Sequence, residues 1–336
     1  MSAREITLLP GDGIGPSVSD ATLEVLQRAG CDFQYQKASI GQTALDAGKE
    51  LIPQETFDLI ERTGVALKGP VTTPIARGFT SVNVTLRKHF DLYANVRPVL
   101  SFKGARALYT GLDLIIIREN TEGMYSGQGQ HRSADDSRAE NLSVITRFES
   151  ERIIRYAFAL ARRLNRRKVT VCHKANILKA TQGLFLDVGR EVAEHYPDIA
   201  HQELIIDNAA MQLVMNPHQF DIIVTTNLFG DILSDLCAGL GGGLGLAPGA
   251  NIGDNKAIFE AVHGSAPDIA GQNIANPTAM MLAACLMLDH LGMCEPAERI
   301  RAAIGGAIET GDRITRDLGG EGGTTDFTDA VLERLG

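Results

Sequence analysis

The stretch Phe220–Asp235 reads Phe-Asp-Ile-Ile-Val-Thr-Thr-Asn-Leu-Phe-Gly-Asp-Ile-Leu-Ser-Asp and carries two structural signals in succession. Its first six residues, Phe220–Thr225, form a short apolar run rich in β-branched residues, which predicts a buried strand. The pattern that continues over Ile232–Leu240 predicts a helix. A buried strand that leads directly into a helix is the repeating unit of α/β proteins. We therefore expect an α/β fold.

The same alternation extends in both directions along the chain. Since a domain usually holds roughly 100 to 200 residues, a chain of 336 residues predicts two lobes. The polar segment around 126–147 is typical of a protruding arm, and the glycine-rich segment 239–253 of a crossing between lobes. Further strands are predicted at Glu5–Leu9, Leu112–Ile117, Lys168–Cys172 and Glu203–Ile206, and further helices from Pro16 to Gly30 and over Glu149–Leu164 and Lys179–Glu194.

Composition narrows the class of protein. Hydrophobic residues make up 44% and charged residues 22%, which is typical of a globular chain. A net charge of −9 argues against a nucleic-acid partner. The longest apolar stretch, around Met280–Leu288, is shorter than the ~20 residues that span a bilayer. Five scattered cysteines indicate neither a disulfide framework nor a zinc site. We expect a cytoplasmic protein with no membrane partner.

A glycine-rich turn, Pro10-Gly-Asp-Gly-Ile-Gly-Pro16, lies between the first strand and the first helix. Its spacing differs from the G-x-G-x-x-G of a dinucleotide fold. Asp32 also begins the next apolar run instead of ending it. The turn therefore predicts close approach of the backbone to a ligand rather than a Rossmann site.

Acidic residues gather around the helix that follows Thr225. Asp231 and Asp235 are four residues apart, so they project from one helix face. A hard divalent cation such as Mg²⁺ or Mn²⁺ suits two such carboxylates. The alternative is that Asp231 interacts with the helix N-terminus while Asp235 is merely solvated. Asp207, at the predicted end of another strand, is a third candidate ligand.

Basic residues at predicted segment ends suit an anionic substrate. Arg87, Arg97 and Arg118 could together hold a tricarboxylate, because each guanidinium binds a carboxylate through two hydrogen bonds. Taken singly, an arginine is more often a surface residue, so these three carry weight only in combination. Lys174 ends the strand Lys168–Cys172 and, beside a metal, could transfer protons near neutral pH.

From Leu9 to about Thr328 the chain resembles the metal-dependent β-decarboxylating dehydrogenases, the family of isocitrate, homoisocitrate and 3-isopropylmalate dehydrogenases. The longest matching block runs from Asn227 to Gly245. The other matching blocks are Lys68-Gly-Pro-Val-Thr-Thr73, Arg118-Glu-Asn-Thr-Glu-Gly-Met-Tyr125, His173-Lys-Ala-Asn176 and His263-Gly-Ser-Ala-Pro-Asp-Ile-Ala-Gly271.

The resemblance implies a fold of two α/β domains that is not a Rossmann fold. It further implies a homodimer whose active sites are built from both subunits. Residues 1–96 and 246–336 would form the large domain on the cofactor side, and residues 97–245 the small domain with the dimer interface. The arm around 126–147 would be the intersubunit clasp.

The resemblance also assigns roles at the substrate site. Arg87, Arg97 and Arg118 match the clamps on the substrate carboxylates, and Ser81 and Asn83 match the loop that distinguishes substrates. Tyr125 matches the acid that protonates the enol carbon, with Lys174 as the base. The implied metal ligands are Asp231 and Asp235 from one subunit and Asp207 from the other.

The cofactor implied by the resemblance is NAD. Asp268 would repel the 2′-phosphate of NADP and can accept hydrogen bonds from the ribose diol of NAD. Relatives specific for NADP have Lys and Tyr at the positions of Asp268 and Ile269. The residues that match cofactor contacts are Ile14, Thr73, Glu260, His263, Gly264, Ser265, Ala266, Asp268, Ile269 and Asn276.

Ser81 and Asn83 favour isocitrate as the substrate, because their side chains can hydrogen-bond its γ-carboxylate. Homoisocitrate is the alternative, since the stretch that begins at Asn208 fits that enzyme too. A noncatalytic regulatory subunit is the alternative from another class. Such subunits usually lack part of the acid, base and metal set, whereas this chain contains all of it.

Overall fold

In the computed structural model, residues 3–73 and 80–336 are described, and the chain divides into two compact units. The first unit comprises 1–86, 100–111 and 238–336, and the second comprises 87–99 and 112–237. The expected division at residues 97 and 245 therefore differs from the observed one. Segment 100–111 belongs to the first unit because it packs there: the Leu108 amide donates to the Leu240 carbonyl at 3.1 Å.

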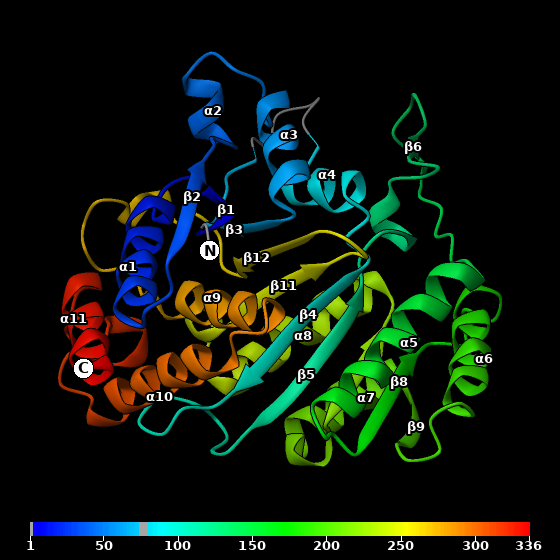
Figure 1. Cartoon of the computed structure of the whole chain (residues 1–336). Coiled ribbons are helices and arrows are strands. Elements are labelled where there is room, and N and C mark those ends of the chain that lie inside the picture. The colour runs from blue at the N-terminus through cyan, green and yellow to red at the C-terminus, as the bar shows by residue number, and fades with distance from the viewer. Residues whose placement is uncertain (1–2, 74–79) are drawn as a thin grey trace. The chain divides into compact units, whose positions relative to one another are not determined.

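The first unit has the strand order β2-β1-β3-β12-β11 (Figure 1). All neighbours in it are parallel except β11 and β12. Its strands are β1 (Arg4–Leu9), β2 (Phe33–Lys37), β3 (Val65–Lys68), β11 (Pro248–Ile252) and β12 (Ala257–Ala261). Its helices are α1 (Gly15–Arg28), α2 (Gln42–Asp46), α3 (Gln54–Thr63), α4 (Val82–His89, which ends in the second unit), α9 (Thr278–His290), α10 (Cys294–Thr310) and α11 (Thr324–Leu335).

Helices cover both faces of this sheet. Because β2 and β3 flank β1 and parallel crossovers are right-handed, α1 and α3 must lie on opposite faces. Helix α9 packs on β3, β11 and β12 and also contacts α1 and α10. It is buried on nearly every side, which is why its sequence is apolar all round. Among the described residues, no helix is both long enough and apolar enough to cross a membrane.

The second unit has the strand order β4-β5-β10-β8-β9. Its strands are β4 (Ala94–Leu100, which ends in the first unit), β5 (Asp113–Glu119), β8 (Lys168–His173), β9 (Ala200–Ile205) and β10 (Ile222–Thr225). Its helices are α5 (Arg147–Arg163), α6 (Thr181–Ala193), α7 (Ile206–Met215) and α8 (Asn227–Gly241, which ends in the first unit). The chain moves outward from β8 to β9 through α6 and returns to β10 through α7. Right-handed crossovers therefore place α6 and α7 on opposite faces.

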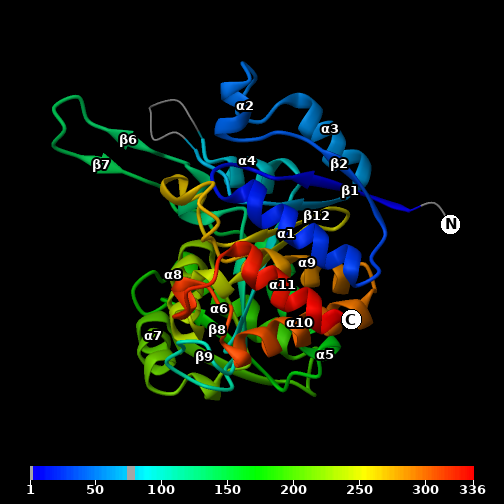
Figure 2. The ribbon, with the colours of Figure 1, turned by 90° about the vertical axis from the view of Figure 1, so that its left-hand side faces the viewer.

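A two-stranded arm leaves the second unit between β5 and α5. Strands β6 (His131–Arg132) and β7 (Ala139–Glu140) pair antiparallel, and their side chains are exposed. Figure 2 shows the arm extending away from the helices and strands of its own unit. The predicted protruding arm is therefore confirmed, while its role as a clasp stays a prediction.

The elements expected from the sequence are present, with two corrections. Asp207 does not end a strand: β9 stops at Ile205, and Asp207 lies in the first turn of α7. Helix α8 begins at Asn227, before the expected Ile232. Strand β9 passes directly into helix α7 with no loop between them, so no turn residue marks this boundary in the sequence.

Candidate active site

Three buried arginines gather in the second unit. Arg118 at the end of β5 is 1% exposed, and Arg97 in β4 and Arg87 in α4 are each 8% exposed. Burial, together with the positive charges of Arg87 and Arg97, lowers the pKa of Arg118 to about 10. The three cations therefore lie close enough to repel one another, and such a cluster favours a bound polyanion.

Asp231 of α8 partly balances this charge. It accepts a hydrogen bond from Arg118, forms an ion pair with Arg97 at 3.4 Å and accepts another hydrogen bond from the Tyr125 hydroxyl. Burial acts to raise the pKa of Asp231, but the arginines and the Tyr125 hydroxyl outweigh it and lower the pKa. Burial and the Asp231 carboxylate raise the pKa of Tyr125, which keeps this phenol protonated. A protonated phenol is thus held beside the arginine cluster.

Asp235 lies one turn further along α8. Its Oδ1 is 3.2 Å from Nη1 of Arg97, so Asp231 and Asp235 share one guanidinium. The predicted projection of both carboxylates from one helix face is confirmed. Asp231 is more than a residue that favours the helix N-terminus, because it is the fifth residue of α8 and pairs with side chains.

Two α8 residues that the sequence did not single out hold Arg118 in place. Oδ1 of Asn227 accepts from Nε of Arg118 at 3.0 Å and from Nη2 at 2.8 Å. Gly230 lets the same side chain lie against the helix, since a methyl group there would be 2.6 Å from Cβ and Cγ of Arg118. Asn227, Gly230 and Asp231 thus all contact the side chain of Arg118.

Lys174 and Asp207 form a separate ion pair in the same unit. Lys174 follows β8, and its hydrogen bond lowers the pKa of Asp207, whose side chain is 68% exposed. Across the residues described for this single chain, no three or more His, Cys, Asp or Glu side chains are grouped to hold a metal ion. The described residues of one chain therefore bring Asp231 and Asp235 together but do not add Asp207 to them.

The two substrate-loop residues lie at the start of α4, in the first unit. Ser81 precedes the helix and is exposed, and Asn83 is in its first turn. The Asn83 side-chain oxygen is buried and has no hydrogen-bond partner among the described residues. Asn83 is four residues before Arg87, so both project from one face of α4.

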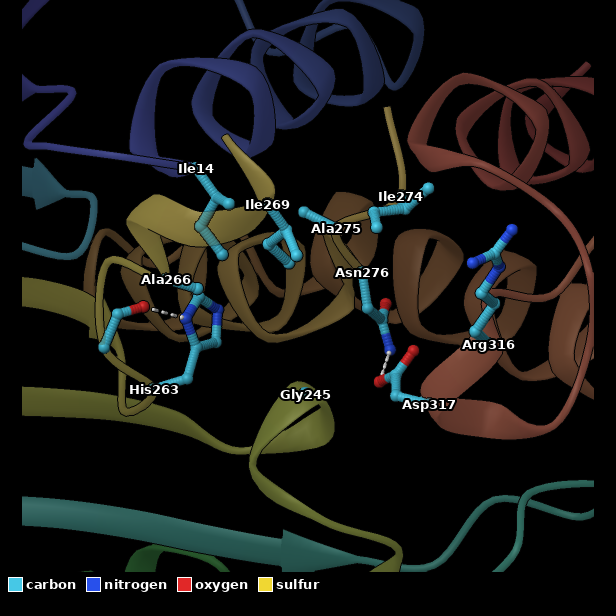
Figure 3. Close-up of a pocket in the computed structure, with 11 residues that line it drawn as sticks. Ile14, Gly245, His263, Ala266, Ile269, Ile274, Ala275, Asn276, Arg316 and Asp317 are labelled. Atoms are coloured by element: carbon cyan, nitrogen blue, oxygen red, sulfur yellow. Dashed lines mark hydrogen bonds between the residues drawn. The ribbon is translucent and has the colours of Figure 1, made fainter. Parts of the chain in front are cut away.

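A cavity of about 540 Å³ lies in the first unit, within the region expected to bind cofactor (Figure 3). Six of the expected residues line it: Ile14, His263, Gly264, Ala266, Ile269 and Asn276. Nδ1 of His263 is bonded to the Gly264 carbonyl at 3.0 Å, while its Nε2 is buried and has no hydrogen-bond partner within the described part of the chain. Burial lowers the pKa of His263, so the ring is neutral at pH 7 and suits stacking against a flat ligand.

The other four expected residues do not line this cavity. Ser265 connects two loops, since its carbonyl accepts from the Ile14 amide at 2.9 Å and its hydroxyl lies 2.6 Å from that of Thr72. Thr73 accepts from the Val82 amide, and Asp268 is exposed beside Ile269. Glu260 is buried in β12, where it pairs with Lys68 at 2.6 Å.

Part of the cavity wall has no signal in the local sequence. Asp317 accepts a hydrogen bond from Asn276 at 2.9 Å, as Figure 3 shows. Gly245 is adjacent, and a methyl group there would be 2.5 Å from the Asp317 carboxylate. The remaining unexpected wall residues are Ile274, Ala275 and Arg316. Asp317 lies 41 residues after Asn276 in a polar segment, so no local pattern points to it.

Two glycines of the glycine-rich turn lie directly against other loops of the protein. A methyl group at Gly11 would be 2.0 Å from the Pro70 carbonyl oxygen, and one at Gly13 would be 2.0 Å from the Ser265 carbonyl oxygen. The glycines thus permit loops of the protein to pack together, while the approach of this turn to a ligand stays a prediction, with Ile14 of the same turn lining the cavity. Buried Asp12 strengthens the packing by accepting from the amides of Gln42, Thr43 and Thr72.

Comparisons with known proteins agree with this architecture. A model of the isocitrate/isopropylmalate dehydrogenase family matches residues 5–331, and the chain belongs to that family. It is 49% identical over 330 residues to isocitrate dehydrogenase (NAD) catalytic subunit 5, mitochondrial, of Arabidopsis thaliana, covering 98% of this chain and 88% of that protein. It is 47% identical over 333 residues to isocitrate dehydrogenase (NAD) subunit alpha, mitochondrial, of Homo sapiens, covering 99% and 90%.

A solved structure gives the same result for the fold. The crystal structure of isocitrate dehydrogenase from Methylococcus capsulatus superposes with a TM-score of 0.95 at 52% sequence identity, covering 99% of each chain. The two-domain fold expected from the resemblance is therefore confirmed.

Proposed function

We propose that this chain is an NAD-dependent isocitrate dehydrogenase, which oxidises isocitrate and releases 2-oxoglutarate and CO₂. The observation that carries the proposal is the cluster of Arg87, Arg97 and Arg118 around Asp231, with the Tyr125 hydroxyl on the same carboxylate. Buried guanidinium groups suit the three carboxylates of isocitrate. Relatives that share 47 to 49% of the sequence carry the name of this enzyme.

The residues of the chain divide the reaction into two proton transfers. Lys174 removes the hydroxyl proton of isocitrate as a hydride leaves the same carbon for NAD, which gives a β-keto acid. Loss of CO₂ leaves an enolate, and Tyr125 delivers a proton to its carbon. The raised pKa of Tyr125 keeps that proton available at neutral pH.

A divalent cation fits the acidic pair. Arg97 already lies within reach of both Asp231 and Asp235, and carboxylate oxygens are the ligands that Mg²⁺ and Mn²⁺ prefer. Asp231 and Asp235 would hold the cation together with Asp207 of a second copy. When bound, it supplies positive charge that lowers the pKa of the substrate hydroxyl and stabilises the enolate.

A homodimer would complete this site. The Lys174–Asp207 pair is bonded to neither Asp231 nor Asp235, and α7 and α8 expose apolar side chains that a second copy would cover. Met211 is 53% exposed, Met215 71% and Ile232 57%. Mixing a Lys174→Ala subunit with an Asp231→Asn subunit should restore activity, because one site of the mixed dimer would be intact. No recovery would argue against shared sites.

The first-unit cavity is proposed to hold the adenosine end of NAD. Its walls are mainly apolar, and exposed Asp268 lies beside the wall residue Ile269. A carboxylate at that position accepts hydrogen bonds from a ribose diol and repels a 2′-phosphate. The relatives described above are mitochondrial by name, whereas a cytoplasmic location stays a proposal for this chain.

The direct test is formation of NADH by the purified protein with isocitrate, NAD and Mn²⁺, with 2-oxoglutarate measured as the product. The expected result is stoichiometric NADH and 2-oxoglutarate, with activity lost on addition of a chelator and restored by Mn²⁺. Activity that arises only after a partner chain is added would support the regulatory-subunit alternative.

A further inference from the structure

Glu122 is a buried carboxylate, and none of the roles described above explains its presence. It lies between Arg118 and Tyr125 in the chain and is 8% exposed. Its two side-chain oxygens accept from the Thr146 amide, at 2.9 and 3.1 Å, and the Thr146 side chain also hydrogen-bonds to this carboxylate. Thr146 is the N-cap of α5, and its own hydroxyl accepts from the Glu149 amide. The side chain of Glu122 is thus hydrogen-bonded to the N-cap of α5, at the position where the arm ends and α5 begins.

The backbone of Glu122 connects the same point to the candidate active site. Its carbonyl accepts from Nδ2 of Asn227 at 3.2 Å, and Asn227 is the residue that holds Arg118 through Oδ1. Glu122 is also the N-cap of the 3₁₀ turn η1 (Gly123–Ser126), which carries Tyr125. The next amide, that of Gly123, donates to the Val144 carbonyl of the returning arm at 3.0 Å.

This carboxylate is held in unfavourable surroundings. Burial raises the pKa of Glu122 to about 7, and the nearby carboxylates of Glu119 and Glu149 add to the increase. A buried acid that accepts only from the uncharged groups of Thr146 is costly, since a neutral acceptor would satisfy those donors. The side chain of Glu122 contacts Thr146 at the start of α5, and its backbone connects to Asn227, which holds Arg118, and to η1, which carries Tyr125.

We propose that Glu122 is a positioning residue, which fixes Tyr125 and the Asn227–Arg118 pair by anchoring η1 to the start of α5 and to the base of the arm. The inference rests on the proposed function, because it assumes that Tyr125 protonates the enol carbon. Removal of the side chain leaves the Thr146 amide without an acceptor and frees η1 to move. A displacement of about 1 Å at a reacting group can lower a rate ~100-fold.

The test compares Glu122→Ala and Glu122→Gln with the matched control Glu149→Ala. Glu149 lies on the first turn of α5, and its side chain pairs with Arg152, with no bond to η1. We expect Glu122→Ala to lower kcat at least tenfold with KM for NAD within about twofold, Glu122→Gln to recover most of kcat, and Glu149→Ala to stay near wild type. In the Tyr125→Phe background, Glu122→Ala should lower kcat by a smaller factor than it does in wild type, because one of the two groups that Glu122 positions is already impaired.

Two results would overturn the inference. One is a Glu122→Ala protein with wild-type kcat and only a lower Tm, and the other is an effect that multiplies fully with that of Tyr125→Phe. Hydrogen exchange of the segment 119–126 gives a readout that needs no activity, and we expect it to accelerate in Glu122→Ala but not in Glu149→Ala. A wild-type protein inactive on isocitrate would refute the proposed function, and the exchange measurement would still decide whether Glu122 holds η1.

Discussion

Gly230 of α8 lies directly against Arg118 of β5, at a distance that leaves no room for a side chain. A methyl group on Gly230 would be 2.6 Å from both Cβ and Cγ of Arg118, and these two atoms are fixed near the strand. The close approach of the Arg118 side chain therefore explains why glycine occupies this position, since alanine has the higher helix propensity. This contact brings Asp231, the next residue, within bonding distance of the Arg118 guanidinium.

Gly230→Ala should consequently separate Arg118 from Asp231. We expect a loss of kcat/KM for isocitrate of about tenfold or more and a destabilisation of ~1–3 kcal/mol from overpacking. Gly239→Ala is the matched control, because it lies in the same helix and an added methyl group there would meet no atom of the described residues within 4 Å. Equal behaviour of the two variants would contradict the proposed contact.

Tyr125→Phe removes one hydroxyl and keeps the ring that lies under the Arg118 guanidinium. A general acid contributes roughly 10²–10⁴ to a rate, so turnover and decarboxylation should fall by about that factor. Binding of metal and of NAD should change little. Release of 2-oxoglutarate and calorimetric binding of Mn²⁺ and NAD are the two measurements. Undiminished turnover by the variant would refute the role of Tyr125 as proton donor.

Cofactor preference should depend on the exposed Asp268 and its neighbour Ile269. The double variant Asp268→Lys, Ile269→Tyr replaces a charge that repels the 2′-phosphate with one that attracts it. We expect the ratio of kcat/KM for NADP over NAD to rise by at least about tenfold, since a hydrogen bond to a charged group contributes roughly 1.5–3 kcal/mol and ~1.4 kcal/mol is a factor of ten. A variant that continues to ignore NADP would count against placing the ribose at this loop.

Glu122 should make stability depend on pH. Folding raises the pKa of Glu122 to about 7. Between the ordinary pKa of a glutamate side chain and pH 7, the folded chain therefore binds more protons than the unfolded chain. The contribution of Glu122 to the free energy of unfolding therefore falls as pH rises through that window and is constant above it. Glu119 and Glu149 are the acidic groups that enlarge the shift, opposed by the Thr146 amide.

Glu122→Gln removes this titration. Relative to wild type, the variant should gain on the order of 1–3 kcal/mol between pH 4.5 and pH 8, measured by denaturant unfolding. Wild type and variant curves that run parallel across this range would show that Glu122 is not the titrating group.

Several features of the site could be predicted from local sequence. Helical spacing placed Asp231 and Asp235 on one face, and the positions after apolar runs indicated Arg118 and Lys174. Other residues acquire their roles only through partners far along the chain. Asn227 is 109 residues from Arg118, and Asn276 is 41 residues from Asp317, so neither contact leaves a periodic signal. The glycines at 11 and 13 indicated close approach correctly, but their neighbours are loops of the protein, which spacing alone does not reveal.

The assignment of substrate depends on which acid the arginine cluster and the Asn83 loop fit best. The most direct measurement is kcat/KM of the purified protein with NAD and Mn²⁺ for isocitrate, homoisocitrate, 3-isopropylmalate and tartrate. We predict a clear preference for isocitrate, with an Arg97→Lys variant losing most of it because the paired bonds of the guanidinium are lost. A preference for any of the other three acids would contradict the account.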